Sequence, residues 1–382
     1  MAKVILIFIQ IAERCSEQRN KRGSEEMKVL AINPGGTSTK IAVYEDKDLI
    51  FKKTIVHSAV DLKDLTKVFD EYEYRLNLIM KTLEEEKVNL SSLSAVVGRG
   101  GLLRPIEGGT YEVNDLMIED VKNAVNGEHA SNLGCVLARN LAEKLGIPAY
   151  VVDPVSVDEF EPEARITGIS DLEKASWLHS LNHKAVARKV AEESGSSYEE
   201  MNMIVVHLGS GISIAAHRKG KAIDGGAGRV DGAFSPERSG GLPTYPLIQL
   251  CYSGKYTYEE MVAKVSTKGG IFDYLKTKDM QEVEAMAESG NEKAELMLKA
   301  FTYQCAKEIG SQATVLSGEV DCIIITGGIA YSKRIVKDIT SRVKFIAPVI
   351  IVPGEEELES LAMGAMRVLS GAEKAKVYPN GR

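Results

Sequence analysis

Three loops combine glycine with hydroxyl-bearing residues next to apolar segments, a pattern that suits anion binding. They lie in KVLAINPGGTSTKIAVYED (Lys28 to Asp46), MIVVHLGSGISIAAHRKGKAIDG (Met203 to Gly225) and CIIITGGIAYSKR (Cys322 to Arg334). Glycine has no Cβ, so backbone N–H groups can approach a phosphate closely, and hydroxyl groups add further donors. The third loop precedes a helix start, which favours phosphate binding there. The first two segments share the order strand, loop, strand, so the sequence predicts a duplicated nucleotide-binding protein.

Apolar alternation and turn signals predict the elements that must position these loops. In the first half we expect strands at 28–33, 39–45, 49–56, 94–97 and 149–153, one helix over 62–87 and two helices between 115 and 145. The second half repeats the meander with strands at 203–208, 211–217 and 220–224, followed by helical stretches. It ends with strands at 321–326 and 348–352 and helices at 291–316, after Gly328 and at 355–369. Two mixed α/β domains with a cleft between them are expected.

Helical spacing within 291–316 marks six residues as core and not as a site: Leu298, Phe301, Cys305, Ile309, Ala313 and Leu316.

Composition restricts the class of protein. The chain has 382 residues, 44% of them hydrophobic, which is enough for a substantial core in two domains. Its net charge of −7 and the absence of a dense basic cluster argue against a nucleic-acid partner. The five cysteines form no CxxC pair, so neither a disulfide framework nor a zinc site is indicated, and a reducing cytoplasm fits best.

The first 26 residues differ from the rest of the chain. The apolar run from Val4 to Ala12 is too short to span a membrane, and no small-residue cleavage site follows it. We therefore expect neither secretion nor membrane association. Because Met27 stands directly before the first clean strand, residues 1–26 are interpreted as an appended, disordered or mis-assigned start.

Seven motifs, in one order, carry a resemblance that spans essentially all of residues 27–370. They are NPGGTSTK (33–40), VVGRGG (96–101), EHASNLG (128–134), VVDPVSVDEFEPEARITG (151–168), HLGSGISIAAH (207–217), FSPERSGGLP (234–243) and ITGGIAYS (325–332). The chain resembles the acetokinase family, within the acetate and sugar kinase, Hsp70 and actin (ASKHA) superfamily. It departs from acetate kinases in carrying Arg99 where those enzymes have a histidine.

The resemblance implies two duplicated ribonuclease H-like (ASKHA) domains with a nucleotide cleft between them. We expect one domain at 27–153 plus 358–382 and a nucleotide-binding domain at 154–357. The implied reaction is direct in-line transfer of phosphate from ATP to a short-chain carboxylic acid, butyrate first, with isobutyrate, propionate or acetate as alternatives. Mg²⁺ is the implied cofactor, ADP the other product and a homodimer or higher homo-oligomer the implied assembly. An ionised carboxylate needs no general base, so the site must instead supply cations and N–H donors against charge repulsion.

By this resemblance, catalytic roles fall on five residues. Arg238 stabilises the transition state through its planar guanidinium, and Arg99 binds the carboxylate or the γ-phosphate. His179 lies against the transferring phosphoryl group. Asp153 orients the site and, together with Asn33 and Glu356, holds Mg²⁺ partly through water and phosphate, although either Glu355 or Glu357 could take the place of Glu356.

Binding roles are implied for the remaining motif residues. Those expected to contact substrate or phosphate are Asn33, Gly35, Thr37, Ser38, Lys40, His129 and His207. Those expected to contact the nucleotide are Gly209, Ser210, Gly211, Gly327, Gly328 and Ile329.

Two other function classes stay open at this point. His179 and His183 are four residues apart on one helical face, so they could hold iron or zinc in a metal-containing transferase of the same fold. A non-catalytic actin-like or chaperone-like ATPase is the third class, but it leaves Arg238 and Arg99 without a role.

Overall fold

The computed structural model describes residues 26–58, 62, 65, 67–228 and 231–379. The chain forms two compact units, Met1–Val157 with Glu356–Arg382, and Asp158–Glu355. The chain passes from the first unit to the second between Val157 and Asp158 and returns between Glu355 and Glu356. Both positions lie a few residues from the expected boundaries at 153/154 and 357/358. Residues 1–26 are interpreted as an added start, and all of them but residue 26 lie outside the described residues.

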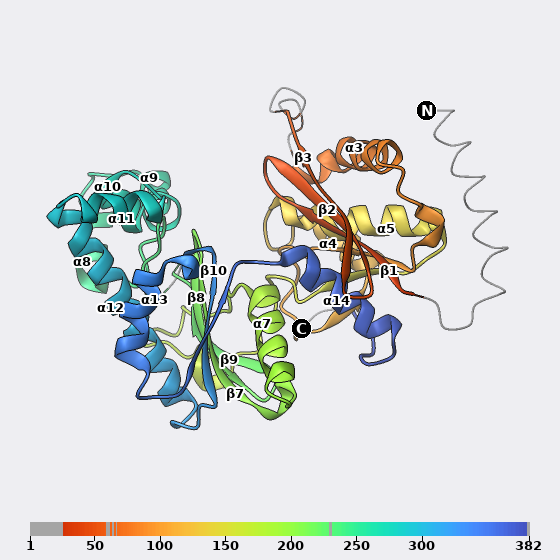
Figure 1. Cartoon of the computed structure of the whole chain (residues 1–382). Coiled ribbons are helices and arrows are strands. Elements are labelled where there is room, and N and C mark those ends of the chain that lie inside the picture. The colour runs from red at the N-terminus through yellow and green to blue at the C-terminus, as the bar shows by residue number, and fades with distance from the viewer. Residues whose placement is uncertain (1–25, 59–61, 63–64, 66, 229–230, 380–382) are drawn as a thin grey trace. The chain divides into compact units, whose positions relative to one another are not determined.

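The first unit is built on a seven-stranded mixed sheet with the order β12-β5-β6-β4-β1-β2-β3 (Figure 1). Its strands are β1 (Lys28–Pro34), β2 (Ser38–Glu45), β3 (Asp48–Val56), β4 (Ala95–Gly98), β5 (Thr110–Glu112), β6 (Ala149–Val152) and β12 (Lys376–Val377). The first three form an antiparallel meander, whereas β1, β4 and β6 run parallel to one another. Parallel strands place their carboxyl ends at one edge of the sheet, and that edge positions the candidate site.

Helices cover both faces of this sheet, which explains why its central strands are apolar throughout. The helices are α3 (Tyr72–Glu85), α4 (Asp115–Lys122), α5 (Leu133–Leu145) and α14 (Glu357–Leu369). Leu30 and Ile32 share one buried core with α3, α4 and α5, while α14 packs against β1, β2, β4 and β6. The expected helix 62–87 is shorter than predicted, because α3 begins only at Tyr72, after a 3-10 turn at Val68–Glu71.

The second unit repeats the scheme around a five-stranded sheet with the order β11-β10-β7-β8-β9. Its strands are β7 (Asn202–Leu208), β8 (Ile212–Arg218), β9 (Lys221–Gly226), β10 (Cys322–Gly327) and β11 (Val349–Pro353). A meander again precedes strands that run parallel to its first member. The predicted repetition of the meander is therefore confirmed.

Two layers of helices enclose the second sheet as well. On one face, α12 (Glu292–Val315) and α13 (Lys333–Val343) pack over Ile204 and Val206, and all six core residues predicted in this segment are buried. On the other face, α7 (Ser180–Glu193) packs over Met203 and Val205. This strand alternation directs His207, Ser213 and His217 to the α7 side of the sheet.

Smaller helices complete the second unit. They are α6 (Pro162–Arg165), α8 (Thr244–Cys251), α9 (Tyr258–Ser266), α10 (Gly270–Leu275) and α11 (Met280–Glu288). In Figure 1, α8 to α11 lie together beside α12. No helix in the described part of the chain is long and apolar enough to cross a membrane.

Candidate active site

In the first unit, the three adjacent parallel strands each deliver a polar residue to the same edge of the sheet. Asn33 stands near the end of β1, Arg99 follows β4 and Asp153 follows β6. The pairing of Ile32 with Gly98, and of Gly98 with Val151, fixes this alignment. Ligands of α/β sheets bind at the carboxyl ends of parallel strands, so this edge is the candidate site of the first unit.

Asn33, Arg99 and Glu357 form one polar cluster there. Asn33 Nδ2 donates to Glu357 Oε2 at 2.5 Å, and the guanidinium of Arg99 pairs with the other carboxylate oxygen of Glu357. Arg99 Nη1 also lies 3.5 Å from Asn33 Oδ1. The cluster presents a cation, a carboxylate and an amide, which together can bind an anion or a hydrated dication.

The three consecutive glutamates at the start of α14 take separate places. Glu355 belongs to the second unit and pairs with His207, while Glu356 is largely exposed and lies 3.7 Å from Lys52. Glu357 is the one that meets Asn33 and Arg99. The structure thus does not bring the predicted Glu356 into the cluster with Asn33, because successive positions at a helix start point in different directions.

Asp153 is buried in a strained backbone conformation. Its φ is +37°, which is rare for a residue other than glycine, and its side chain is 1% exposed. Asp153 Oδ1 accepts from the backbone N–H of Gly109 at 2.7 Å, and its own N–H donates to the Gly109 carbonyl at 3.0 Å. These two bonds tie the end of β6 to the start of β5, so Asp153 acts on the geometry of this edge.

His129 lies beside this group and caps the turn that leads into α5. Its Nδ1 accepts from the Ser131 backbone N–H at 3.2 Å and lies 2.7 Å from the Ser131 hydroxyl. Desolvation and the nearby Arg99 guanidinium lower the pKa of His129. The end of β4 at Gly98 packs closely against the start of α5, because a Cβ on Gly98 would lie 1.9 Å from the Gly134 carbonyl oxygen.

The loop between β1 and β2 and the start of β2 contain Gly35, Thr37, Ser38 and Lys40, and the buried Arg75 of α3 holds the loop in place. Arg75 donates to the carbonyls of Gly35 at 2.8 Å and Gly36 at 3.3 Å, and to Thr39 Oγ1 at 3.1 Å. Its charge is paired with Glu71 at 2.6 Å. Binding both glycine carbonyls fixes the orientation of this loop.

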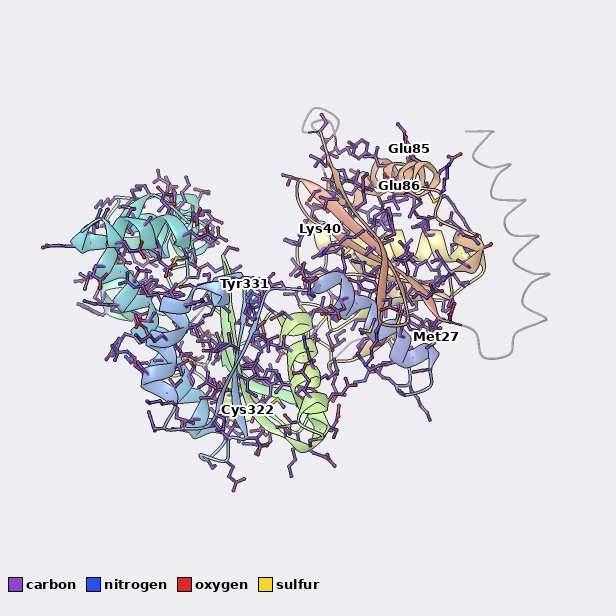
Figure 2. All side chains as sticks on the ribbon, in the orientation of Figure 1. Met27, Lys40, Glu85, Glu86, Cys322 and Tyr331 are labelled. Carbon is purple, nitrogen blue, oxygen red and sulfur yellow. The ribbon has the colours of Figure 1, made fainter. Side chains whose placement is uncertain are left out.

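The side chains of the loop differ in exposure. Thr37 is exposed and Ser38 is partly buried, as expected for residues that could meet a ligand. Lys40 is exposed on β2, where its backbone pairs with Asn33 (Figure 2). Lys40 therefore belongs to the same region of the sheet as the Asn33 cluster.

In the second unit, the carboxyl ends of β7, β10 and β11 repeat this design. The Gly209–Ser210–Gly211 loop follows β7, Gly327 ends β10 and Glu355 follows β11. Gly327 has φ +89°, and a Cβ there would lie 2.3 Å from the Leu208 carbonyl oxygen, so only glycine fits. The structure thus brings the predicted nucleotide-contacting loops together, with Gly328 exposed and Ile329 partly buried in the next turn.

Arg238 lies against the first of these glycine loops. The Ser235 hydroxyl accepts from the Arg238 backbone N–H at 3.1 Å and donates to the Ser210 carbonyl at 2.8 Å. Arg238 Nη1 is 3.4 Å from the Ala227 carbonyl oxygen. The turn that carries Arg238 is therefore fastened to the Gly209–Gly211 loop through Ser235.

Gly211 leaves the space that the Arg238 guanidinium occupies. A Cβ on Gly211 would lie 2.6 Å from Arg238 Nη1 and 2.7 Å from Cζ. Because Arg238 is the residue predicted to stabilise the transition state, we expect Gly211→Ala to fold normally but to lower kcat on the order of 100-fold, as a small displacement of such a group does. Thermal unfolding and steady-state kinetics measure both. The matched control is Gly310→Ala, whose Cβ would have no neighbour within 4 Å; wild-type kinetics in Gly211→Ala would contradict the prediction.

His179 and His207 stack face to face beside the same loop, with ring centroids 4.0 Å apart. His207 Nδ1 lies 2.8 Å from Asn182 Oδ1, and His207 Nε2 lies 3.0 Å from Glu355 Oε1. His179 Nδ1 lies 2.8 Å from the Ser213 hydroxyl. Both predicted histidines are thus held in fixed orientations at this edge of the second sheet.

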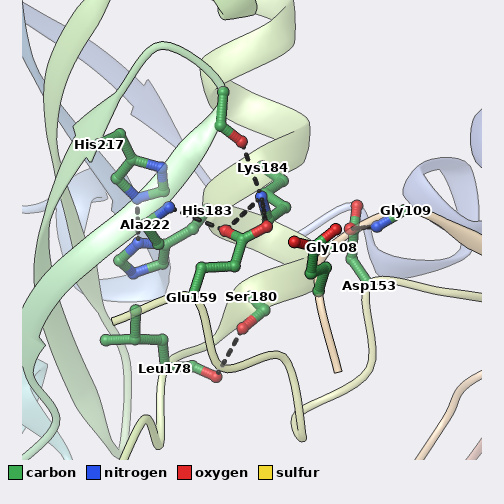
Figure 3. Close-up of polar contacts among 12 residues, drawn as sticks. Gly108, Gly109, Asp153, Glu159, Leu178, Ser180, His183, Lys184, His217 and Ala222 are labelled. Carbon is green, nitrogen blue, oxygen red and sulfur yellow. Dashed lines mark hydrogen bonds and ion pairs between the residues drawn. The ribbon is translucent and has the colours of Figure 1, made fainter. Parts of the chain in front are cut away.

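His179 and His183, whose spacing could suit a metal, instead contact the hydroxyl of Ser213. His183 Nε2 lies 2.8 Å from the Ser213 hydroxyl. His183 Nδ1 lies 3.1 Å from His217 Nε2 (Figure 3). Both ring nitrogens of His183 are engaged and cannot also bind a metal. Within the described residues, no group of three or more His, Cys, Asp or Glu side chains is arranged to hold a metal ion.

Three buried histidines make stability depend on pH. Burial lowers the pKa of His183 to about 3, lowers that of His217 well below its usual value, and, with Arg75, lowers that of His57 to about 4. Unfolded histidines bind protons below pH ~6.5, whereas these folded ones stay neutral. The free energy of unfolding should therefore fall as pH drops from 7.5 to 5, by about 1 kcal/mol per histidine for each pH unit below 6.5.

Urea denaturation at several pH values checks this expectation. The single tryptophan, Trp177, lies two residues before His179 and reports on the second unit. Ordinary Asp and Glu side chains titrate near pH 4, so they contribute little above pH 5. Equal free energies at pH 7.5 and 5.5 would disprove the assignment of these histidines as neutral.

Comparison of the sequence with known proteins identifies the family. The sequence profile of the acetokinase family matches residues 176–371. Butyrate kinase 1 from Clostridium acetobutylicum is 51% identical over 352 residues, which are 92% of this chain and 99% of that protein. The chain belongs to the acetokinase family. The resemblance inferred from the seven motifs is thereby confirmed.

Solved structures agree with the fold of this acetokinase family member. Acetate kinase from Porphyromonas gingivalis matches with a TM-score of 0.75, covering 90% of this chain and 100% of that chain at 21% identity. A propionate kinase from Francisella tularensis subsp. tularensis matches with a TM-score of 0.65, covering 88% and 98% at 20% identity. The expected α/β fold with two ASKHA domains is confirmed.

Several residues of these clusters were missed by sequence reasoning. They are Arg75, Asn182, Tyr198, Ser213 and His217. Ser213 and His217 are four residues apart on β8, as are His179, directly before α7, and His183 on α7, and this matched spacing was the signal available. Arg75 gave no comparable signal, because an arginine in a charged helix usually faces solvent.

Proposed function

We propose that this acetokinase family member is a butyrate kinase that converts butyrate and ATP into butyryl phosphate and ADP. The observation that carries the proposal is the 51% identity with Butyrate kinase 1 across 92% of the chain. The polar clusters at the strand ends of both units support it, since they contain the cations that a reaction between two anions requires.

The reaction needs charge stabilisation more than proton transfer. Butyrate is ionised at neutral pH, so its oxygen attacks the γ-phosphorus directly and the bond to the ADP oxygen breaks in line. We assign transition-state stabilisation to Arg238, whose fork of donors matches the equatorial phosphoryl oxygens. His179 supplies a further donor, His207 supports it by stacking on its ring, and the glycine loops at 209–211 and 327–329 bind the nucleotide.

In the first unit, Arg99 pairs with an anionic oxygen of the substrate, while Gly35, Thr37, Ser38, Lys40 and His129 line the phosphate side. Asp153 orients this edge through Gly109. Mg²⁺ fits the oxygen atoms of Asn33 and Glu357, because a hard dication takes one or two such ligands together with phosphate and water. When bound, Mg²⁺ neutralises charge on the phosphate oxygens. We assign this role to Glu357 in place of Glu356, which lies near Lys52.

The length of the acid is the finer part of the proposal. One methylene group in an apolar pocket changes the free energy of binding by only about 1 to 3 kcal/mol. Butyrate is therefore preferred over isobutyrate, propionate and acetate by a modest factor. We further propose a homo-oligomer that works in the cytoplasm, where ATP is available.

A hydroxamate assay tests the function directly. Purified protein is incubated with ATP, Mg²⁺, hydroxylamine and one acid from a series from acetate to valerate that includes isobutyrate. The expected result is acyl hydroxamate with a maximum at four-carbon acids. Product that peaks at acetate or propionate would change the substrate and keep the reaction class, whereas no product with any acid would reject the kinase.

A further inference from the structure

A continuous chain of hydrogen bonds runs through the interior of the second unit and ends at His179. The Tyr198 hydroxyl lies 2.6 Å from His217 Nδ1, and His217 Nε2 lies 3.1 Å from His183 Nδ1. His183 Nε2 and His179 Nδ1 each lie 2.8 Å from the Ser213 hydroxyl. Figure 3 shows the central link between His183 and His217.

The interior members of this chain are cut off from water. His183, His217 and Ser213 are all 0% exposed, and Tyr198 is 2% exposed. The chain alternates between α7 and β8 before it reaches Tyr198 in the turn Tyr198–Glu200. Buried polar groups are costly unless each donor meets an acceptor, so hydrogen positions along the chain are interdependent.

Ser213 couples the ring tautomers of the two histidines that it contacts. Its hydroxyl has one hydrogen to donate and accepts two. One accepting position is taken by the His179 backbone N–H at 3.3 Å. Of the two imidazoles, one must therefore donate to Ser213 and the other must accept from it. If the direction of one of these hydrogen bonds is reversed, every other hydrogen bond in the chain must reverse as well.

Tyr198 selects the direction. A phenol O–H is a stronger hydrogen-bond donor than a neutral imidazole N–H, and an imidazole nitrogen is a stronger acceptor than a phenol oxygen, so the 2.6 Å contact with His217 runs from the tyrosine to the ring. Tyr198 therefore donates to His217 Nδ1. His217 Nε2–H then donates to His183 Nδ1, His183 Nε2–H donates to Ser213, and Ser213 donates to His179 Nδ1. The remaining ring hydrogen of His179 is placed on Nε2.

The groups around this chain of hydrogen bonds keep its histidines neutral. On α7, Lys184 and Arg188 lie near His217, and Lys184 is paired with Glu159 at 2.8 Å. On β7, His207 lies near His183, with ring centroids 6.4 Å apart. Burial is the main cause that lowers the pKa of both His183 and His217, and these neighbours lower it further. Each ring thus carries one hydrogen, as the single direction requires.

We infer that Tyr198, His217, His183 and Ser213 are positioning residues that hold His179 as the neutral tautomer with its hydrogen on Nε2. The importance of this tautomer for turnover rests on the proposed function, whereas the tautomer itself does not. A fixed Nε2–H donor stabilises charge that develops on a phosphoryl oxygen without exchanging a proton with the substrate. Rotation or tautomer exchange of His179 would remove that donor.

Nitrogen-15 spectra of histidine-labelled protein test the inference, because protonated and unprotonated ring nitrogens resonate in different regions. In the wild-type protein we expect His179 Nε2 protonated and Nδ1 unprotonated. Tyr198→Phe and Ser213→Ala remove the first and the last hydroxyl of the chain. Both should give mixed tautomers at His179 and lower kcat roughly 10-fold, as loss of an orienting partner does elsewhere, with little change in the KM for ATP.

Tyr252→Phe is the matched control, since Tyr252 is 88% exposed in the same unit, and it should leave the spectrum and kcat unchanged. An unaltered Nε2–H tautomer in both chain variants would overturn the inference, as would a wild-type His179 protonated on Nδ1. Ser213→Ala retains the test if Tyr198→Phe does not fold. If no acid is phosphorylated, the proposed function fails while the spectra still decide the tautomer.

Discussion

Arg238→Ala is expected to form acyl phosphate at least about 10³-fold more slowly than the wild-type protein, with little change in stability. An arginine that neutralises charge on a transferring phosphoryl group contributes about 10³ to 10⁵ to kcat. The turn that carries Arg238 is held through Ser235, because Ser235 Oγ accepts from the Arg238 backbone N–H and donates to the Ser210 carbonyl. Loss of the side chain therefore removes donors from the site and leaves the loop in place.

Kinetics with one carboxylic acid and hydroxylamine trapping measure the rate of acyl phosphate formation, and thermal unfolding measures the stability. Arg238→Lys keeps the charge but not the planar fork, so it should recover only part of the rate. Arg342→Ala removes an exposed arginine from α13 of the same unit and serves as the control. A kcat within about threefold of wild type in Arg238→Ala would refute the assigned role.

Arg75→Met is expected to lower the stability of the first unit by about 3 to 5 kcal/mol, because it leaves the Glu71 carboxylate without its buried partner. Arg75 is fully buried and donates to Glu71, Thr39 and the carbonyls of Gly35 and Gly36. Methionine fills similar space but offers no donors. The loop between β1 and β2 should lose its orientation at the same time.

Hydrogen exchange of the β1–β2 segment measures this effect within the first unit. Lys81→Met is the matched control, because Lys81 and Glu85 form the same kind of pair on the same helix but lie 3.7 Å apart and are 71% and 64% exposed. An exposed pair of this kind contributes only about 0.3 to 0.5 kcal/mol. Equal protection in the two variants would show that Arg75 is not a structural anchor of the loop.

The sequence alone determined the order of the main elements and predicted which loops contact phosphate. Strand alternation, glycine positions and helical spacing are local properties, and local patterns suffice where packing follows them, as at 291–316. Motif order was also sufficient for the family, since seven short segments carry it. The short strands Thr110–Glu112 and Lys376–Val377 were not predicted, because two or three residues show no periodicity.

Only the tertiary structure decided which side chains meet. Three consecutive glutamates have the same local chemistry, and Glu357 is distinguished only by its contact with Asn33, 324 residues away in sequence. Likewise, the spacing of His179 and His183 is compatible with a metal pair until Ser213 and His217 of β8 are placed beside them. Contacts between distant segments depend on how helices pack on sheets, and the register of that packing is not encoded in any single segment.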